Sequence, residues 1–137
     1  MKKIGQETLK RCDILVVLDT NVIIDYLIGK EDVVREVNSY GKNELSTTFV
    51  NEYELLKKDR RKTMEDVIQN LRVYHSNDMS ARAAARAYLE LKSRGKMISD
   101  NDLLIFGICV ANDEVLLTQD KAFAYLRSSN VKILNDC

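Results

Sequence analysis

Four acidic residues lie far apart in this chain, and each stands where an apolar run gives way to a helical pattern or inside the helix just begun: Asp19, Glu54, Asp102 and Asp120. If the apolar runs are parallel strands of one sheet, their carboxyl ends lie along one edge, which is where open α/β sheets bind ligands. The repeated placement therefore predicts that the four carboxylates converge at the edge of a parallel sheet.

The hydrophobic pattern alternates between strand-like and helical segments along the whole chain. Residues 14–18 are a continuous run of Ile, Leu and Val, typical of a strand covered on both faces, and a helical pattern over 22–27 follows before Gly29. Further strands are predicted at 45–50, 73–75, 115–117 and 131–134, and further helices at 33–40, 53–56, 64–71, 80–91, 99–110 and 123–126. Such alternation predicts an α/β fold, a three-layer α/β/α sandwich with a mostly parallel central sheet.

Polar residues and glycines predict where several helices begin and end. Asn51, Ser80 and Ser99 each open a helical pattern and suit an N-cap, where a side-chain oxygen accepts a free backbone N–H. Gly95 follows the alanine-rich helix and suits the left-handed conformation after a helix end.

The length and charge of the chain limit its organisation and its partners. A chain of 137 residues can bury one core and is too short for two ordinary domains, so we expect a single domain over 1–137. Lys and Arg together number 21, as do Asp and Glu, so the whole molecule supplies no net field for a polyanion. Any attraction to nucleic acid must come from local basic patches.

Cysteine usage and hydropathy favour a cytoplasmic protein. Cys12, Cys109 and Cys137 are odd in number and lack CxxC spacing, and Cys109 lies in an apolar helical pattern where a thiol acts as a small hydrophobe. Residues 1–13 contain no long apolar segment, and no apolar run approaches membrane-spanning length. We therefore expect a reduced protein that is neither exported nor membrane-bound.

Helix capping is the structural alternative for each acid taken singly. Asp19 and Asp120 could cap the helices that follow them, Ser99 to Asp102 is close to a capping box, and Glu54 suits the positive end of a helix dipole. Ser, Thr or Asn would cap equally well, however, so capping does not require acids at all the strand ends.

Taken together, the four acids predict a metal site. Asn21, Asp100 and Asn101 add oxygen donors beside the same edge, and no His or Cys accompanies them in the pattern. Clustered oxygen ligands suit a hard cation such as Mg²⁺ or Mn²⁺, which activates water and stabilises charge in phosphoryl chemistry.

Four segments carry a family resemblance. Residues 18–25 read Leu-Asp-Thr-Asn-Val-Ile-Ile-Asp, and residues 50–56 read Val-Asn-Glu-Tyr-Glu-Leu-Leu. Residues 98–105 read Ile-Ser-Asp-Asn-Asp-Leu-Leu-Ile, and residues 116–123 read Leu-Leu-Thr-Gln-Asp-Lys-Ala-Phe. In this order and spacing they resemble the acid-bearing segments of small PIN domains, so the chain is similar to that family from Val16 to Leu134.

The resemblance implies a function. Most PIN proteins of this size are VapC-type toxins, which are endoribonucleases dependent on Mg²⁺ or Mn²⁺. They usually form homodimers, and a small antitoxin inhibits them by placing a segment in the acidic groove. On the matching positions, the metal-binding and catalytic acids would be Asp19, Glu54, Asp102 and Asp120, with Asp100 as an auxiliary ligand. Thr118 matches a hydroxyl near the site, and Thr20 and Asn21 follow the first acid as they do in the family.

The chain also departs from the family pattern. Glu52 rivals Glu54 as the second acid, and Asn51 stands where Thr is common. Phe106 and Gly107 replace the usual pair of alanines after Ile105. These departures concern the second acid and local packing.

Basic and aromatic residues are weaker candidates for RNA binding. The densest basic stretch is Lys57, Lys58, Arg60, Arg61 and Lys62. It follows the helix that carries Glu54 and could bind phosphates, although a solvated helix end is the common role of such a run. The single histidine, His75, is given no role, and Tyr26, Tyr53 and Tyr88 are more typical of core or dimer surface than of base stacking.

Other classes of function remain open. A haloacid-dehalogenase phosphatase would carry Asp-x-Asp, whereas the chain has Asp19-Thr20-Asn21, and the paired acids of a receiver domain are incomplete. A housekeeping RNA-processing nuclease and a non-catalytic PIN-fold interaction module both fit the same four acids.

Overall fold

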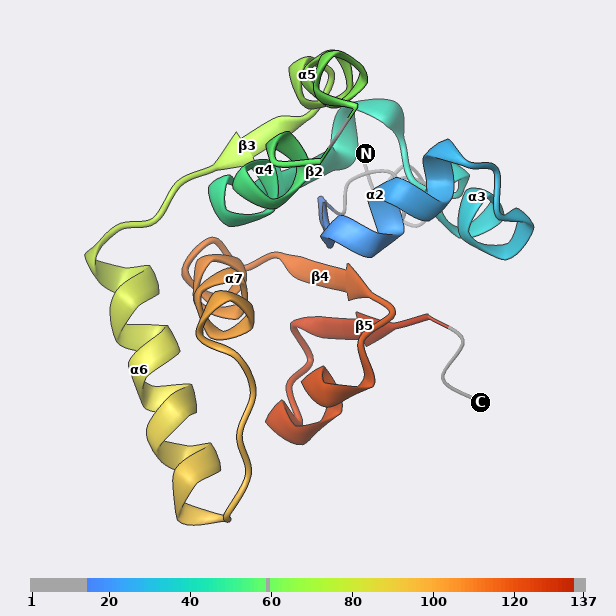
Figure 1. Cartoon of the computed structure of the whole chain (residues 1–137). Coiled ribbons are helices and arrows are strands. Elements are labelled where there is room, and N and C mark those ends of the chain that lie inside the picture. The colour runs from blue at the N-terminus through green and yellow to red at the C-terminus, as the bar shows by residue number, and fades with distance from the viewer. Residues whose placement is uncertain (1–14, 59, 135–137) are drawn as a thin grey trace, which may run out of the picture.

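Short parallel strands pair side by side, and the central strand β1 (Val16–Leu18) is apolar and buried on both faces. Within residues 15–58 and 60–134, which this computed structural model describes, they form one five-stranded sheet in the order β3-β2-β1-β4-β5 (Figure 1). The strands are β1 (Val16–Leu18), β2 (Leu45–Thr48), β3 (Arg72–Tyr74), β4 (Val115–Thr118) and β5 (Val131–Ile133). Every pairing between neighbours is parallel, so the predicted sheet is confirmed.

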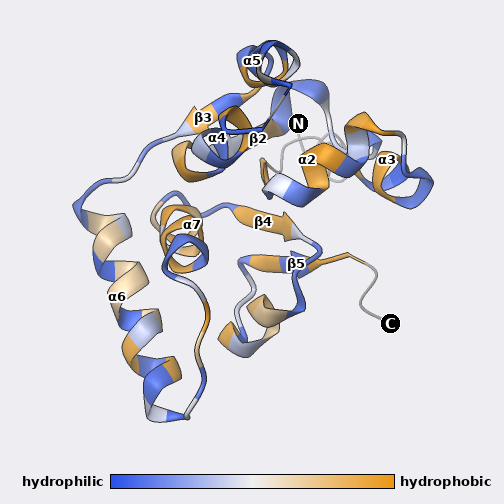
Figure 2. Ribbon diagram, viewed as in Figure 1, coloured by the Kyte–Doolittle hydropathy of each residue, from blue (hydrophilic) through white to orange (hydrophobic). Residues whose placement is uncertain are grey.

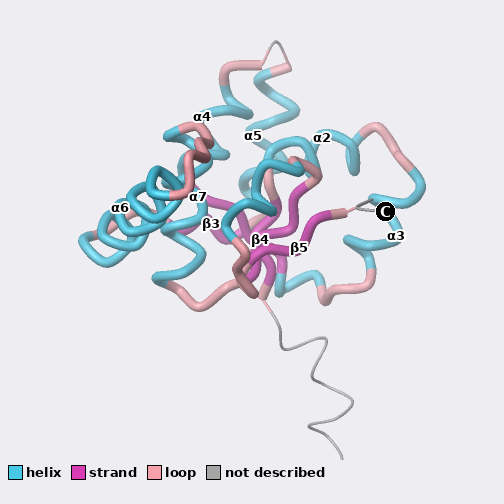
Figure 3. The backbone as a smooth tube through the Cα atoms, turned by 90° about the horizontal axis from the view of Figure 1, so that it is seen from below, coloured by secondary structure: helices cyan, strands magenta, loops and turns pink. Residues whose placement is uncertain are grey.

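Helices cover both faces of the sheet, as the three-layer prediction requires. They are α2 (Thr20–Leu27), α3 (Glu31–Asn38), α4 (Phe49–Leu56), α5 (Arg61–Gln69), α6 (Asp78–Ser93) and α7 (Asp100–Ala111), with 3₁₀ helices η1 (Lys42–Glu44) and η2 (Lys121–Leu126). Figure 3 shows the strands in the middle of the molecule with helices on either side.

Alternate residues of the strands supply the two halves of the core. Val16 and Leu18 of β1 pack with Leu117 of β4 against α2, α3 and α5, whereas Val17 and Leu116 pack against α7 and η2. The strand β4 is mostly orange in the hydropathy colouring (Figure 2), as expected of a strand buried on both faces, whereas the edge strand β5 carries the exposed Lys132. Cys109 lies in this core, and burial raises the pKa of its thiol, so it acts as a small hydrophobe as predicted.

The chain reverses its direction of winding between β1 and β4. It proceeds outward from β1 to β2 and β3, and then returns to add β4 on the other side of β1. Ligands bind to such sheets outside the carboxyl ends of the strands, where the strand order reverses. The carboxyl ends of β1 and β4 lie side by side, because Leu18 is in register with Leu117.

Most predicted boundaries hold within a few residues, and two caps lie elsewhere. The strand predicted to reach residue 50 ends at Thr48, because the Thr48 side chain caps α4 and places Asn51 inside the first turn. Asn77, rather than Ser80, is the N-cap of α6, and Ser80 completes the capping box from the third helical position. The predictions for Ser99 as an N-cap and Gly95 as a left-handed residue are confirmed. Ile14, the predicted start of the first strand, lies outside the described residues, as do Cys12 and Cys137.

No helix within residues 15–58 and 60–134 has both the length and the apolar character to cross a membrane.

Gly107 explains one departure from the family pattern. It lies on α7 against α6, and an added Cβ would stand 2.3 Å from the backbone oxygen of Ser80 and 3.0 Å from the Cβ of Ala84. Backbone atoms cannot move aside as a flexible side chain can. The close packing of the two helices therefore requires glycine at this position.

We predict that Gly107→Ala destabilises the protein by about 1–3 kcal/mol, the usual cost of overpacking a dense interior. The sign is informative, since Gly→Ala inside a helix ordinarily stabilises it by roughly 0.5–1 kcal/mol. Urea unfolding of the parent and the variant measures the difference. An unchanged or raised unfolding free energy would show that α6 and α7 can separate without cost.

Candidate functional site

A pocket of about 240 Å³ lies at the carboxyl ends of the strands, where the winding reverses. Its lining residues are Asp19, Thr20, Asn21, Glu54, Lys57, Lys58, Asp102 and Asp120. All four acids singled out in the sequence line this one pocket, although they are spread over about a hundred positions of the chain. We call it the acid pocket.

Asp19 is the most firmly held of the four acids. It follows β1 directly and is only 7% exposed. Its Oδ1 accepts from the Thr20 amide at 2.9 Å and from Asn51 Nδ2 at 3.0 Å, and its Oδ2 accepts from Thr118 Oγ1 at 2.6 Å. Burial nevertheless raises the pKa of Asp19, and the charge of Glu54 adds to the rise. The fold thus fixes a carboxylate where its charge is disfavoured.

Glu54, and not Glu52, is the glutamate of the acid pocket. Its Oε1 accepts from Thr20 Oγ1 at 2.5 Å, and its Oε2 accepts from Asn101 Nδ2 at 3.3 Å. Glu52, two residues earlier on α4, lines a different hollow together with Tyr53 and His75. The two glutamates therefore lie on different faces of the helix, which the sequence alone left open.

Asn51 is a site residue that the sequence reasoning missed. It is fully buried, and its amide nitrogen donates to Asp19 Oδ1 and to Thr20 Oγ1, both at 3.0 Å. Its amide oxygen accepts from Thr48 Oγ1 at 2.8 Å. One amide supplies both the donors and the acceptor, which a threonine hydroxyl in its place could not do simultaneously. The departure from the family pattern was the available signal.

Thr20 and Thr118 position acids. Thr118 is fully buried and donates to Asp19, and Thr20 is 8% exposed and donates to Glu54. Asn21, by contrast, is exposed at the mouth of the acid pocket.

Asp102 has the most perturbed charge in the acid pocket. It lies half-buried in the first turn of α7, and burial raises its pKa to about 6. A hydrogen bond with Ser99 lowers the pKa, and the charges of Asp19, Asp120 and Glu54 raise it further, in that order. Carboxylates that raise one another's pKa are close enough to repel, so a cation between them would be favoured.

Two acids of the acid pocket are also helix N-caps. Asp19 caps α2 through the Thr20 amide, and Asp120 caps η2 by accepting from the Ala122 amide at 2.9 Å. The capping interpretation is therefore correct for both residues. It accounts for one oxygen of each carboxylate and leaves the choice of an acid over Asn or Ser unexplained.

The donor set fits a hard cation in kind. Carboxylate and amide oxygens line the acid pocket, and its two cationic side chains are Lys57 and Lys58. Among the described residues, however, no three His, Cys, Asp or Glu side chains form a group that could hold a metal ion as they stand. Asp100 lines a separate hollow between α6 and α7. The predicted ligand set therefore stays a prediction.

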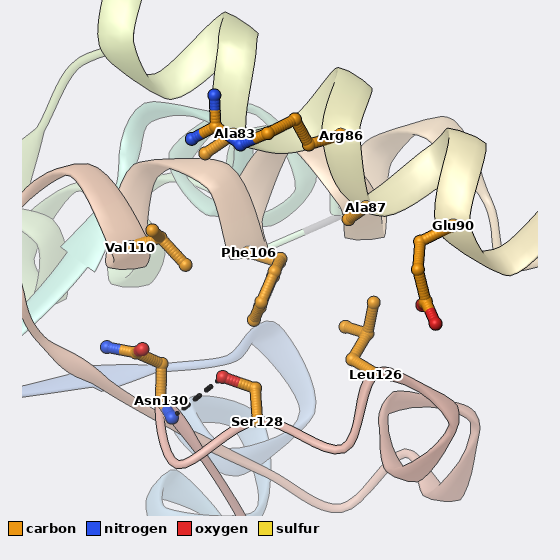
Figure 4. Close-up of a pocket in the computed structure, with 9 residues that line it drawn as sticks. All are labelled: Ala83, Arg86, Ala87, Glu90, Phe106, Val110, Leu126, Ser128 and Asn130. Atoms are coloured by element: carbon orange, nitrogen blue, oxygen red, sulfur yellow. Dashed lines mark hydrogen bonds between the residues drawn. The ribbon is translucent and has the colours of Figure 1, made fainter.

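Another cavity, of about 340 Å³, lies between α6, α7 and the segment after η2 (Figure 4). Phe106 and Leu126 point into it, and the backbone N–H of Asn130 donates to Ser128 Oγ beside it. Its one carboxylate, Glu90, is engaged by Arg94. This lining offers packing surface and none of the clustered charge of the acid pocket.

A family model and a curated relative both match this chain. The model of the PIN domain family matches residues 16–128. Ribonuclease VapC3 of Methanocaldococcus jannaschii is 29% identical over 92 residues, which cover 67% of this chain and 95% of that protein.

Solved structures share the fold. A chain of VapBC-1 from nontypeable Haemophilus influenzae superposes with a TM-score of 0.73 at 21% identity, covering 88% of this chain and 98% of that one. A chain of FitAcB from Neisseria gonorrhoeae gives a TM-score of 0.72 at 22% identity, covering 85% and 96%.

The raised pKa of Asp102 predicts a pH-dependent stability in the metal-free protein. A group with a folded-state pKa near 6 and an unfolded value of 3.8 binds its proton more tightly when folded. Its contribution to stability is complete below about pH 4 and is lost as the pH rises through 6. Asp102→Asn should therefore match the parent near pH 4 and exceed its thermal midpoint above pH 7.

Thermal midpoints in EDTA from pH 4 to pH 8 measure this difference. Asp78→Asn is the matched control, since Asp78 also lies in the first turn of a helix but outside the acid pocket. A gain that is the same at every pH, or equal in the two variants, would contradict the prediction.

Proposed function

The chain belongs to the PIN domain family, and from this membership and the acid pocket we propose that it is an endoribonuclease. It hydrolyses RNA phosphodiester bonds with Mg²⁺ or Mn²⁺ and acts as the toxin of a VapBC-type toxin–antitoxin pair. We treat residues 1–137 as one PIN-like nuclease domain of the cytoplasm. The observation that carries the proposal is the convergence of Asp19, Glu54, Asp102 and Asp120 on one pocket beside two lysines. The relationship to Ribonuclease VapC3 supports the same activity.

Asp19, Asp102 and Asp120 are the proposed metal ligands, and Glu54 completes the set. A bound divalent ion would lower the pKa of water and stabilise the charge of the phosphorane-like transition state. Asp19 is held for this role by Asn51 and Thr118. Since Asp100 lies in another hollow, it is not part of the proposed set.

The protein's own groups position the nucleophile and the substrate. Thr20 fixes one oxygen of Glu54, which leaves this carboxylate oriented to direct a water toward the phosphate. Lys57 and Lys58 line the acid pocket and supply positive charge for the RNA backbone, and exposed Asn21 offers an amide at its mouth. The chain as a whole has no net charge, so these two lysines are the positive side chains that the acid pocket itself offers to a phosphate.

The same charge cluster suits the proposed protein partner. Carboxylates that repel one another are stabilised by an arginine, whose guanidinium pairs with a carboxylate through two hydrogen bonds. An antitoxin segment carrying such a side chain would occupy the acidic groove and exclude RNA. We also propose that the chain forms a homodimer. The structures of VapBC-1 and FitAcB share this fold.

A non-catalytic interaction module is the second candidate. The observation in its favour is that no three acids of the described chain form a ready group for a metal ion. A nuclease must bring its acids together when the cation binds, whereas a binding module need not.

We predict that the protein cleaves RNA with Mg²⁺ or Mn²⁺ and stops in EDTA, and that Asp120→Asn separates metal binding from capping. Asn caps about as well as Asp, so metal-free stability at pH 7 should stay within about 0.5 kcal/mol of the parent or rise. The rise in thermal midpoint caused by Mn²⁺ should shrink. Cleavage of a mixed RNA pool should fall at least ~100-fold, equivalent to ~3 kcal/mol of transition-state stabilisation.

Asp78→Asn serves as the control for lost charge at a helix start and should retain the parent's rate and Mn²⁺ response. Cleavage at full rate in excess chelator would reject the metal-dependent mechanism. No cleavage with any RNA, together with an unchanged Mn²⁺ response in Asp120→Asn, would favour the interaction module.

We predict that the protein expressed from its native locus co-purifies with a small partner and that the toxin alone dimerises at micromolar concentration. Light scattering gives the mass, and addition of the partner should abolish RNA cleavage. A monomer with no co-purifying protein would favour a housekeeping nuclease over a toxin.

A further inference from the structure

A second hollow of about 480 Å³ adjoins the acid pocket. Its lining residues are Phe49, Glu52, Tyr53, Leu56, Lys57 and His75. Lys57 also lines the acid pocket, so the two spaces meet at this side chain. We call this second hollow the aromatic hollow. We propose that it binds one base of a single-stranded RNA whose neighbouring phosphate enters the acid pocket. This inference rests on the proposed function and adds the form of its substrate.

The aromatic hollow offers flat surfaces to a flat ligand. The rings of Phe49 and His75 stack with centroids 6.3 Å apart and planes inclined by 26°. Tyr53 is 57% exposed, and Lys57 Nζ lies 4.7 Å from the centroid of its ring. Tyr53 is thus not a core residue, and its exposed surface is of the kind on which bases stack in single-stranded nucleic-acid sites.

The spacing on α4 connects the two spaces. Tyr53 and Glu54 are consecutive and therefore point to adjoining faces of the helix, one toward each space. Lys57 is four residues after Tyr53 and three after Glu54, so it neighbours both on the helix surface. A nucleotide has the same layout, with its base and its phosphate on opposite sides of one sugar. Lys57 would then contact the phosphate that joins them.

The edge of the aromatic hollow carries one acceptor. Glu52 is a carboxylate among rings and the aliphatic Leu56. It can accept a hydrogen bond from a donor on the edge of a base, such as an exocyclic amino group or a ring N–H. The hollow can therefore hold a base by its edge as well as by its face.

A second copy of the chain is the competing occupant, since exposed aromatic residues also occur at protein interfaces. The base is favoured because three of the six lining residues carry rings and because the hollow shares the lining lysine Lys57 with the acid pocket. A dimer contact would need neither feature.

The test uses Tyr53→Leu, which keeps an apolar side chain and removes the ring, with Tyr53→Phe as the matched control. Fluorescent single-stranded RNA oligomers, intact or with one abasic nucleotide at successive positions, are bound to the full chain with Ca²⁺ in place of Mg²⁺, so that a hard cation offsets the acids, and are followed by anisotropy. Stacking of one base is worth roughly 5- to 100-fold in affinity. We expect Tyr53→Leu to weaken binding about tenfold and Tyr53→Phe to change it less than twofold.

One abasic position should cost the parent a similar factor and cost Tyr53→Leu nothing further, because the base and the ring form a single contact. His75→Leu, which removes the stack on Phe49, gives a second independent variant with a smaller loss. Thermal midpoints verify folding, and light scattering verifies the oligomeric state.

Equal RNA affinity of the parent and Tyr53→Leu overturns the inference, as does a change in oligomeric state with RNA affinity preserved. RNA cleavage without dependence on Tyr53 rejects this inference and leaves the proposed nuclease intact. Base-dependent binding without cleavage upholds this inference and rejects the nuclease. Failure of the parent to bind any oligomer overturns the inference.

Discussion

The buried carboxylate of Asp19 is the interaction on which the arrangement of the acid pocket depends. It receives hydrogen bonds from Thr118 at the end of β4, from Asn51 on α4 and from the Thr20 amide at the start of α2. Strands on both sides of the winding reversal are thus joined at one side chain. Because its pKa is raised by burial, these bonds hold a charge that the surrounding core disfavours.

The placement of the other acids follows from that centre. Thr20 links Glu54 to this hydrogen-bond network, since its hydroxyl accepts from Asn51 and donates to Glu54. Ser99 is the donor that lowers the pKa of Asp102 among the described residues, and burial raises this pKa to about 6. The acid pocket therefore combines fixed carboxylates with one that changes protonation near neutrality, an arrangement typical of functional sites.

Sequence patterns predicted the layers, the parallel sheet and the convergence of four acids on one pocket, because each depends on the local hydrophobic period and on the common direction of parallel strands. They could not predict the role of Asn51, since its partners Asp19 and Thr20 are some thirty positions away in the chain. Nor could they decide between Glu52 and Glu54, because that choice depends on which face of α4 lies toward the acid pocket. Gly107 needed the crossing of α6 and α7 to be explained.

The electrostatics of the acid pocket link stability to occupancy. Burial and mutual repulsion raise the pKa values of Asp19 and Asp102, so the protein without a cation is less stable at neutral pH than its packing alone would make it. Any group that brings positive charge lowers this cost. A divalent ion would do so while supplying a bound water for hydrolysis, and the arginine of the proposed antitoxin would do so without supplying one. The divalent ion and the arginine would then compete for the same carboxylates. This competition explains physically why one groove could serve both activity and inhibition.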